Sequence, residues 1–160
     1  MTVNKMEKIA LLLGGNIGDT AKFFDFALAG LAAGGVEDLR RSRIFRTAPV
    51  DCVPGTPDFL NCAATGFFGG SPSELLALTQ RLEREAGRPA EHSSREARVL
   101  DIDIILFGAR VIAEEKLAVP HPRARLRRFV LEPLAGIAPE MRFPDTGESV
   151  AEALARLAEP

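Results

Sequence analysis

Residues 99–107 read VLDIDIILF, an apolar and β-branched run that two carboxylates interrupt and that Gly108 ends. A run of this length and composition is typical of a buried β-strand. Successive side chains of a strand point to opposite faces, so Asp101 and Asp103 share one face, with their Cα atoms roughly 6–7 Å apart. The apolar side chains expected on the other face, in the core, are Leu100, Ile102, Ile104 and Leu106.

Two carboxylates on a mostly buried strand need partners, because an unpaired buried charge is costly. They can be solvated on an edge strand, paired with arginine, or shared by a cation. Oxygen ligands on a rigid strand suit Mg²⁺, which takes one or two carboxylates from a protein and completes its shell with water and phosphate. Asp101 and Asp103 are therefore candidate metal ligands, and the alternative that both simply face water stays open.

The composition is that of an ordinary globular protein. The chain has 160 residues, and we expect a single domain spanning residues 1–160. The formal net charge of −2 predicts no general attraction to nucleic acid or to an anionic membrane. Cys52 and Cys62 lack metal-ligand spacing and are expected to be free thiols of a reducing compartment. The apolar run at 9–13 is too short for a signal peptide or a membrane span, so we expect a cytoplasmic protein.

The rest of the chain alternates strand and helix patterns. Strands are expected over 8–13, 39–46 and 59–68, helices from Asp19 or Thr20 to Gly34 and from Ser71 to Gly87, a loop over 88–98, a hairpin-like segment over 111–119, a strand or irregular segment over 130–137, and a terminal helix opening at 149–152. The glycine-rich stretch GGNIGD at 14–19 resembles half of a nucleotide-binding loop but does not match the consensus patterns, and a tight strand-to-helix turn is the alternative. The order β-α-β-β-α-β predicts a ferredoxin-like α+β fold, an antiparallel sheet with helices packed on one face.

Basic side chains flank the aspartate strand in the sequence. Arg88, Arg95 and Arg98 precede it, and Lys116, His121 and Arg127 follow it. Acidic residues that hold Mg²⁺, together with cations that stabilise the transferred group, are what polyphosphate chemistry requires. Two metal ions about 3.5–4 Å apart would be able to share the two aspartates. The alternatives are that Arg98 pairs with Asp101 and that the other arginines are solvated.

Phe59 and Asn61 fall on one face of the strand expected over 59–68. An aromatic plane beside an amide, which offers both hydrogen-bond donors and an acceptor, suits a flat heterocycle that forms hydrogen bonds. The alternative is that Phe59 belongs to the core and Asn61 merely ends a strand.

Six stretches of the chain together resemble one known family. They are LLLGGNIGD at 11–19, FRTAP at 45–49, PDFLN at 57–61, LTQRLEREAGR at 78–88, RVLDIDIILFG at 98–108 and LAVPHPRARLRRFVLEPLAGIAPE at 117–140. Over nearly its whole length the chain resembles the 6-hydroxymethyl-7,8-dihydropterin pyrophosphokinases. The resemblance implies a ferredoxin-like fold and the transfer of pyrophosphate from ATP to the hydroxymethyl group of the pterin, with release of AMP, in tetrahydrofolate biosynthesis.

The resemblance also implies site residues. Asp101 and Asp103 are expected to bind two Mg²⁺ ions between ATP and the pterin, and Arg88 and Arg98 to contact the phosphates and assist transfer. The other residues expected to line the ATP site are Gln80, Glu83, Lys116, His121 and Arg127. The residues expected to form the pterin pocket are Thr47, Phe59, Asn61 and Phe129. ATP and hydroxymethyldihydropterin are the expected partners, and the chain is expected to be a monomer or a weak homodimer.

The chain departs from the family pattern just before the aspartate strand. The loop commonly reads R-W-G-P-R, whereas Arg95 and Ala97 here replace the tryptophan and the proline. Gly15 replaces a frequent serine, Lys116 an arginine and Pro122 an aromatic residue.

Two rival functions remain. One is a two-metal nucleotidyl transferase, which would release pyrophosphate rather than AMP. The other is an RNA-binding module, which needs exposed aromatic side chains flanked by basic ones on the sheet.

Overall fold

The computed structural model describes residues 5–49, 54–87 and 99–158. Its elements in chain order are β1 (Glu7–Gly15), α1 (Thr20–Ala33), β2 (Glu37–Arg41), β3 (Phe45–Thr47), β4 (Phe59–Phe68), α2 (Pro72–Glu85), β5 (Asp101–Phe107), β6 (Ile112–Ala113), β7 (Ala118–Val119), the 3-10 turn η1 (Ala124–Leu126), α3 (Arg128–Ala135) and α4 (Val150–Ala158). None of the helices within these ranges is long and apolar enough to cross a membrane.

The main sheet has the strand order β2-β4-β1-β5, with β3 also paired to β4, and every one of these pairs is antiparallel. Because β4 lies between β1 and β2, the two β-α-β units interleave as they do in the ferredoxin-like fold. The predicted α+β fold is therefore confirmed. β6 and β7 pair with each other as the short hairpin expected over 111–119.

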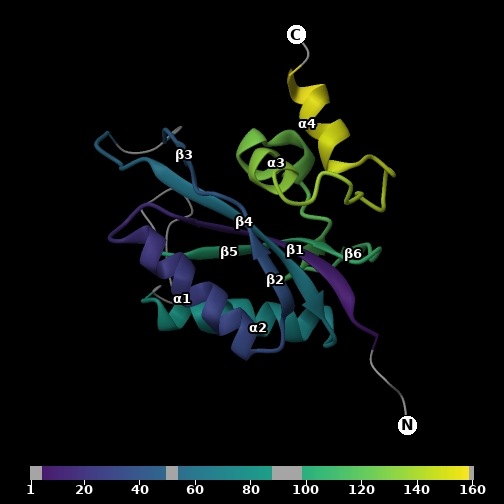
Figure 1. Ribbon diagram of the computed structural model, residues 1–160, viewed down its shortest axis with the longest axis horizontal. Helices are drawn as coiled ribbons and strands as arrows, with labels where there is room; N and C mark the ends of the chain where they lie inside the picture. Colours follow the sequence, from purple (N-terminus) through teal and green to yellow (C-terminus); the bar gives the residue numbers. More distant parts are fainter. Residues whose placement is uncertain (1–4, 50–53, 88–98, 159–160) are drawn as a thin grey trace.

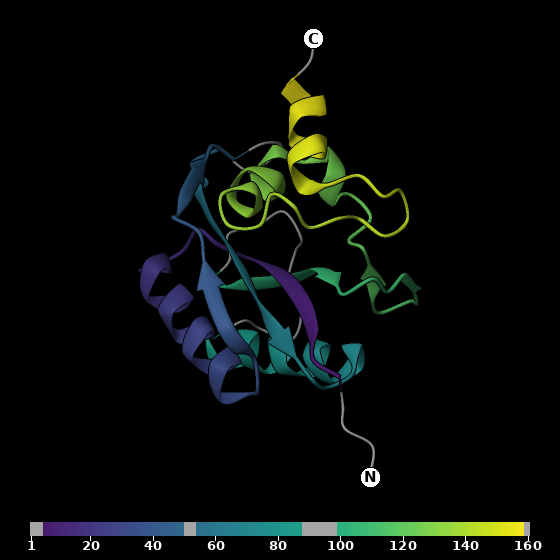
Figure 2. The ribbon, with the colours of Figure 1, turned by 45° about the vertical axis from the view of Figure 1, so that its right-hand side comes forward.

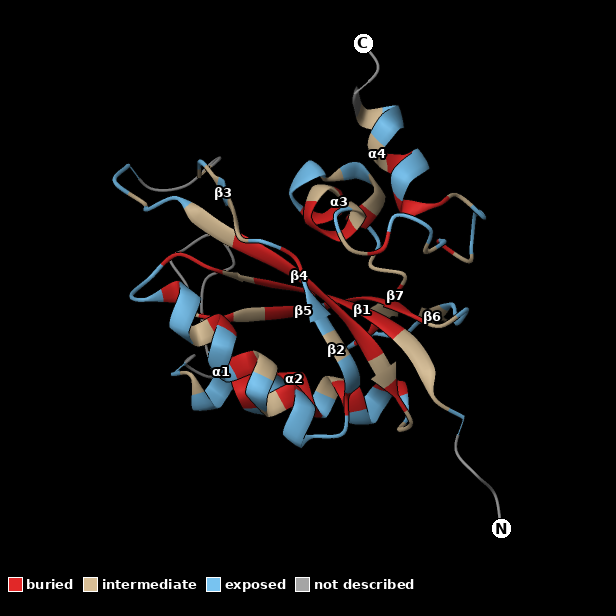
Figure 3. Cartoon of the chain, in the orientation of Figure 1, coloured by how far each residue is buried: buried red, intermediate tan, exposed pale blue. Residues whose placement is uncertain are grey.

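Helices cover both faces of the sheet. Ile9 and Leu11 of β1 belong to the core under α1 and α2, whereas Ala10 and Leu12 belong to a second core under α3 and α4. Figures 1 and 2 show the two helix pairs on opposite sides of the sheet, and Figure 3 shows the buried residues concentrated between these layers. The expectation of helices on one face is wrong, because β1 is apolar on both faces and each face needs its own cover.

The segment expected over 130–137 as a strand or irregular structure is helical. Val130, Leu131 and Leu134 are buried with the spacing of a helix face. Pro133 lies inside α3, which ends at Ala135, so the proline interrupts only the last turn of a short helix. A short apolar run does not distinguish a strand from a helix by composition, and here the contact with the second core favours the helix.

β5 begins at Asp101, two residues after its predicted start, and contains a bulge. Where β1 advances from Ala10 to Leu11, β5 advances by two residues, so Ile105 is the extra residue. Leu106 consequently lies in the core under α3 and α4, and its predicted place on the opposite face is wrong. Before the bulge, the predicted alternation of the aspartates with buried isoleucines is confirmed.

The capping signals in the sequence form the expected helix starts. The side chain of Asp19 caps α1. Ser71 and Glu74 form a reciprocal capping box at the start of α2, and Ser149 and Glu152 form another at the start of α4. Local hydrogen bonds of this kind depend on spacing alone, which is why they can be read from the sequence.

Candidate active site

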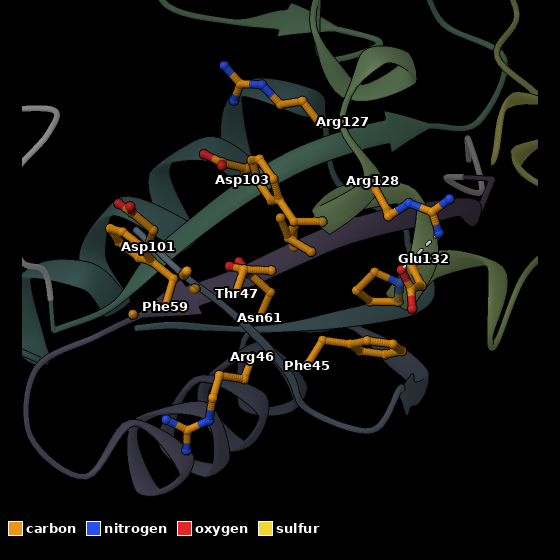
Figure 4. A pocket seen from close by; sticks show the side chains of 16 residues that line it. Phe45, Arg46, Thr47, Phe59, Asn61, Asp101, Asp103, Arg127, Arg128 and Glu132 are labelled. Carbon is orange, nitrogen blue, oxygen red and sulfur yellow. Dashed lines mark hydrogen bonds and ion pairs between the residues drawn. The ribbon is translucent and has the colours of Figure 1, made fainter. Parts of the chain in front are cut away.

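A cavity of about 560 Å³ lies between the sheet and α3 (Figure 4). It is lined by Leu12, Gly14 and Gly15 of β1, Phe45, Arg46, Thr47 and Ala48 in and after β3, Phe59 and Asn61 of β4, Asp101 and Asp103 of β5, and Arg127, Arg128, Phe129, Glu132 and Pro133 in and before α3. The predicted site residues that the structure brings together here are Thr47, Phe59, Asn61, Asp101, Asp103, Arg127 and Phe129. Side chains that are far apart in the sequence therefore share one cavity.

The sheet register places Asn61 and Asp101 on either side of Gly14. Gly14 pairs with Asn61 of β4 and with Asp101 of β5, and side chains of directly paired residues share a face. Because Gly14 has no side chain, the floor of the cavity is open between the amide and the carboxylate. A Cβ atom at Gly14 would stand 3.1 Å from Oδ1 of Asn61. The turn predicted over 14–19 begins later than expected, since β1 continues through Gly15.

Asp101 and Asp103 stand on the cavity side of β5, with Asp101 half-buried and Asp103 exposed. In Figure 4 both carboxylates lie on the same side of the cavity as the guanidinium of Arg127. The backbone between them is held from outside the sheet, because Oε2 of Glu83 in α2 accepts a hydrogen bond from the Ile102 N–H at 2.8 Å. The carboxylates are therefore presented side by side on an anchored strand.

This donor set fits Mg²⁺. Magnesium usually takes one or two carboxylates from a protein and leaves its other positions to water and phosphate oxygens. Within the described ranges, no group of three or more histidine, cysteine, aspartate or glutamate side chains is placed to hold a metal ion. The aspartate pair beside an open cavity thus fits a magnesium ion that also binds phosphate oxygens.

His121 is half-buried close to this charged region. Burial lowers its pKa from the usual 6.5, Asp103 opposes that effect, and the positive charges of Arg127 and Arg123 lower the pKa further. Nδ1 of His121 accepts a hydrogen bond from the Arg123 N–H at 3.4 Å. In the neutral ring the proton is then on Nε2, where it is able to donate to an anion.

The other half of the cavity is aromatic. Thr47 pairs with Phe59 and Phe45 with Asn61 across β3 and β4, so these four side chains share the cavity face. Phe129 lines the cavity from α3 and is 37% exposed. Phe45 was not among the predicted site residues, although its position two residues before Thr47 in a strand places both on one face. The amide of Asn61 is therefore nearly buried and lines the same cavity as three aromatic rings.

Several predicted ATP-site residues lie away from the cavity lining. Gln80 is exposed on α2, and Lys116 is exposed between β6 and β7. Their predicted contacts with ATP stay predictions. Arg88, Arg98 and the altered loop residues at 95–97 lie outside the described residues.

Part of the cavity lining was not predicted from the sequence. Arg128 and Glu132, four residues apart on α3, form an ion pair of 3.4 Å at the cavity. Their spacing is the signal that would have placed them on one helix face. Gly14 carries no such signal, because its role depends on which residues the sheet places beside it.

The fold and the cavity together define a class, a ferredoxin-like α+β protein whose sheet carries an aromatic and amide pocket beside a carboxylate pair. Residues 10–139 match the family described as 7,8-dihydro-6-hydroxymethylpterin-pyrophosphokinase (HPPK). The chain belongs to this family.

Several named proteins are similar to this chain over most of its length. A protein of Methylorubrum extorquens named 2-amino-4-hydroxy-6-hydroxymethyldihydropteridine pyrophosphokinase is 38% identical over 156 residues, which cover 95% of this chain and 94% of that protein. A Synechocystis protein of the same name is 37% identical over 139 residues, covering 86% of this chain and 70% of that one. Folic acid synthesis protein fol1 of Pneumocystis carinii is 32% identical over 145 residues, or 91% of this chain.

Some of these relatives are much longer. The chain spans 19% of the Pneumocystis protein and 27% and 23% of two folate synthesis bifunctional proteins of Arabidopsis thaliana. The crystal structure of wild-type Plasmodium falciparum HPPK-DHPS with pteroate superimposes with a TM-score of 0.72 at 13% identity, over 98% of this chain and 43% of that one. At that identity the likeness shows a common fold.

Proposed function

We propose that this chain transfers the pyrophosphoryl group of ATP to the hydroxymethyl group of 6-hydroxymethyl-7,8-dihydropterin, giving the pterin diphosphate and AMP, in folate biosynthesis. Membership of the family and the names of the Methylorubrum and Synechocystis relatives support this activity. The observation that carries it is the row of Asn61, Gly14 and Asp101, which joins a heterocycle pocket to a carboxylate site within one cavity. The family match over 10–139 supports residues 1–160 acting as one domain.

The aromatic half of the cavity is the proposed pterin site. A pterin is flat, and its ring edge alternates hydrogen-bond donors and acceptors, which the amide of Asn61 is able to match. The rings of Phe59 and Phe129 offer faces for stacking, and Thr47 adds a hydroxyl on the same side. The buried position of Asn61, only 6% exposed, strengthens its hydrogen bonds to a bound ring.

The acidic and basic half is the proposed phosphate site. Asp101 and Asp103 are the proposed ligands of Mg²⁺, two ions in number, which when bound neutralise charge on the phosphate oxygens. We propose that the guanidinium of Arg127 and the Nε2–H of His121 contact the phosphates, and we propose the same for Arg88 and Arg98 from the sequence. Positive charge around the transferred group stabilises the charge that develops in phosphoryl transfer.

In the proposed reaction the hydroxymethyl oxygen attacks the β-phosphorus of ATP. The bond from that phosphorus to the oxygen it shares with the α-phosphorus breaks, AMP leaves with this oxygen, and the hydroxyl proton passes to solvent. Asn61 and the aromatic rings orient the acceptor, while the aspartate side orients the triphosphate, so the cavity acts mainly by positioning the two substrates.

The experiment that tests this function is product analysis. The purified chain is incubated with ATP and MgCl₂, with and without 6-hydroxymethyl-7,8-dihydropterin, and the products are separated by chromatography. We expect AMP and pterin diphosphate in equal amounts, and only when both substrates are present. Release of pyrophosphate would indicate a nucleotidyl transferase, and salt-sensitive RNA binding without ATP turnover would indicate an RNA-binding module. Either result would overturn the proposal.

A further inference from the structure

Ser42 lies between β2 and β3, where the structure divides the single strand expected over 39–46. In β2, Arg41 pairs with Ala64 of β4, and in β3, Phe45 pairs with Asn61 of β4. From Arg41 to Phe45 the chain advances by four residues, while β4 advances by three from Ala64 to Asn61. The junction therefore holds one extra residue, which is a β-bulge.

The extra residue determines which face of β3 is turned toward the cavity. Side chains alternate along a strand, so a register shift of one residue turns every side chain to the opposite face. If the register of β2 continued unchanged, Ile44 would stand opposite Asn61. With the bulge, Phe45 stands there instead, and Phe45 and Thr47 both line the cavity.

The hydroxyl of Ser42 completes the hydrogen bonding of the bulge. The Ser42 N–H donates to the carbonyl of Ala63 at 2.9 Å, and the Ala63 N–H donates back to Oγ of Ser42 at 2.9 Å. Oγ in turn donates to the carbonyl of Arg43 at 2.7 Å. Ser42 is only 5% exposed, so loss of the hydroxyl would leave the buried Ala63 N–H without its acceptor.

We propose that Ser42 is a positioning residue for the pterin side of the active site. Its hydroxyl stabilises the bulge that turns Phe45 and Thr47 into the cavity. That this part of the cavity binds a pterin rests on the proposed function, whereas the role of the hydroxyl in the bulge does not. The aspartates lie on β5 and Arg127 precedes α3, so the phosphate side does not depend on β3.

The test compares three variants. Ser42→Ala removes the hydroxyl, and Ser42→Thr keeps it. Ser149→Ala is the matched control, because it removes another buried hydroxyl, which accepts the Glu152 N–H at 3.0 Å at the start of α4. For each protein, calorimetry gives the Kd of hydroxymethyldihydropterin in the presence of Mg²⁺ and a non-hydrolysable ATP analogue, and separately the Kd of the analogue. NMR gives the hydrogen-exchange rate of the Ala63 amide.

We expect Ser42→Ala to raise the pterin Kd about tenfold. The Kd of the ATP analogue should not change comparably, and exchange at Ala63 should become faster. Ser42→Thr, which keeps the hydroxyl, should have the pterin Kd and the Ala63 exchange rate of the wild type. The control Ser149→Ala should lower the melting temperature and leave both Kd values as in the wild type. Ser42→Cys, which has a slightly larger side chain and a much weaker acceptor, replaces Ser42→Ala if that variant does not fold.

Two results would overturn the inference. One is a pterin Kd and an Ala63 exchange rate that do not respond to Ser42→Ala. The other is an equal loss of pterin and ATP-analogue affinity, which would indicate a general effect on the fold. A wild-type protein that binds no pterin would contradict the proposed function instead, and the exchange rate of Ala63 would then still decide whether the hydroxyl supports the bulge.

Discussion

Oε2 of Glu83 accepts a hydrogen bond of 2.8 Å from the backbone N–H of Ile102, the residue between the two aspartates. Among the described strands, β5 lies at the edge of the main sheet and pairs with β1. The bond from α2 holds the Ile102 N–H on the side of β5 that faces away from β1. Glu83, for which the family resemblance implies a place in the ATP site, anchors the strand that presents both carboxylates.

We expect Glu83→Ala to lower kcat/KM about tenfold. The N–H of Ile102 would lose its acceptor, at a cost of about 1–3 kcal/mol for a buried group, and β5 would be free to shift. Glu83→Gln keeps an acceptor oxygen and should retain most of the activity. Steady-state kinetics over a range of Mg²⁺ concentrations measures both variants. If Glu83→Gln is as impaired as Glu83→Ala, the charge matters rather than the bond to Ile102.

We expect Gly14→Ala to raise the KM for the pterin by roughly ten- to a hundredfold, because a displacement of about 1 Å in an active site can have an effect of that size. The added methyl group would stand 3.1 Å from Oδ1 of Asn61, on the floor of the cavity. Gly14 does not have a positive φ, so alanine suits the backbone itself. The control is Gly136→Ala at the end of α3, where φ is −67°. A variant with normal pterin KM would show that the open floor is not needed.

Replacing either aspartate by asparagine should reduce turnover at least about a hundredfold while leaving the fold intact, because asparagine keeps the shape and removes the charge that a cation requires. Calorimetry should show weaker binding of Mg²⁺ with an ATP analogue to Asp101→Asn and Asp103→Asn. Asp25→Asn is the matched control, since Asp25 is exposed on α1 and pairs with Arg41 at 3.3 Å. Normal magnesium-dependent turnover in both site variants would contradict the metal assignment.

The lowered pKa of His121 predicts a pH effect on stability. Burial makes the folded protein bind a proton at His121 less readily than the unfolded chain, whose histidine has a pKa near 6.5. The stability that neutral His121 contributes is thus present above pH 6.5 and is lost as the pH falls through the folded pKa. In metal-free protein, the melting temperature of wild type relative to His121→Gln should decrease from pH 7.5 to pH 5 (chosen on either side of about 6.5). A difference that is constant or grows would contradict this sign.

Local patterns in the sequence were enough for part of the fold. The alternation in residues 99–107 placed Asp101 and Asp103 on one face, and the capping signals at Ser71 and Ser149 located two helix starts. These features depend on spacings of two to four residues along the chain, which every sequence displays directly. The element order likewise predicted the ferredoxin-like sheet.

Only the tertiary structure decided the features that depend on pairing between distant segments. Gly14 became the open floor of the cavity because Asn61 and Asp101 stand beside it in the sheet. The bulge at Ile105 reversed the face of the residues beyond it, which is why Leu106 was misplaced. The bulge near Ser42 likewise decided that Phe45, rather than Ile44, stands opposite Asn61. A bulge is defined against the partner strand, so the register of a sheet is a property of two segments together. The composition and spacing of one segment therefore do not predict the register.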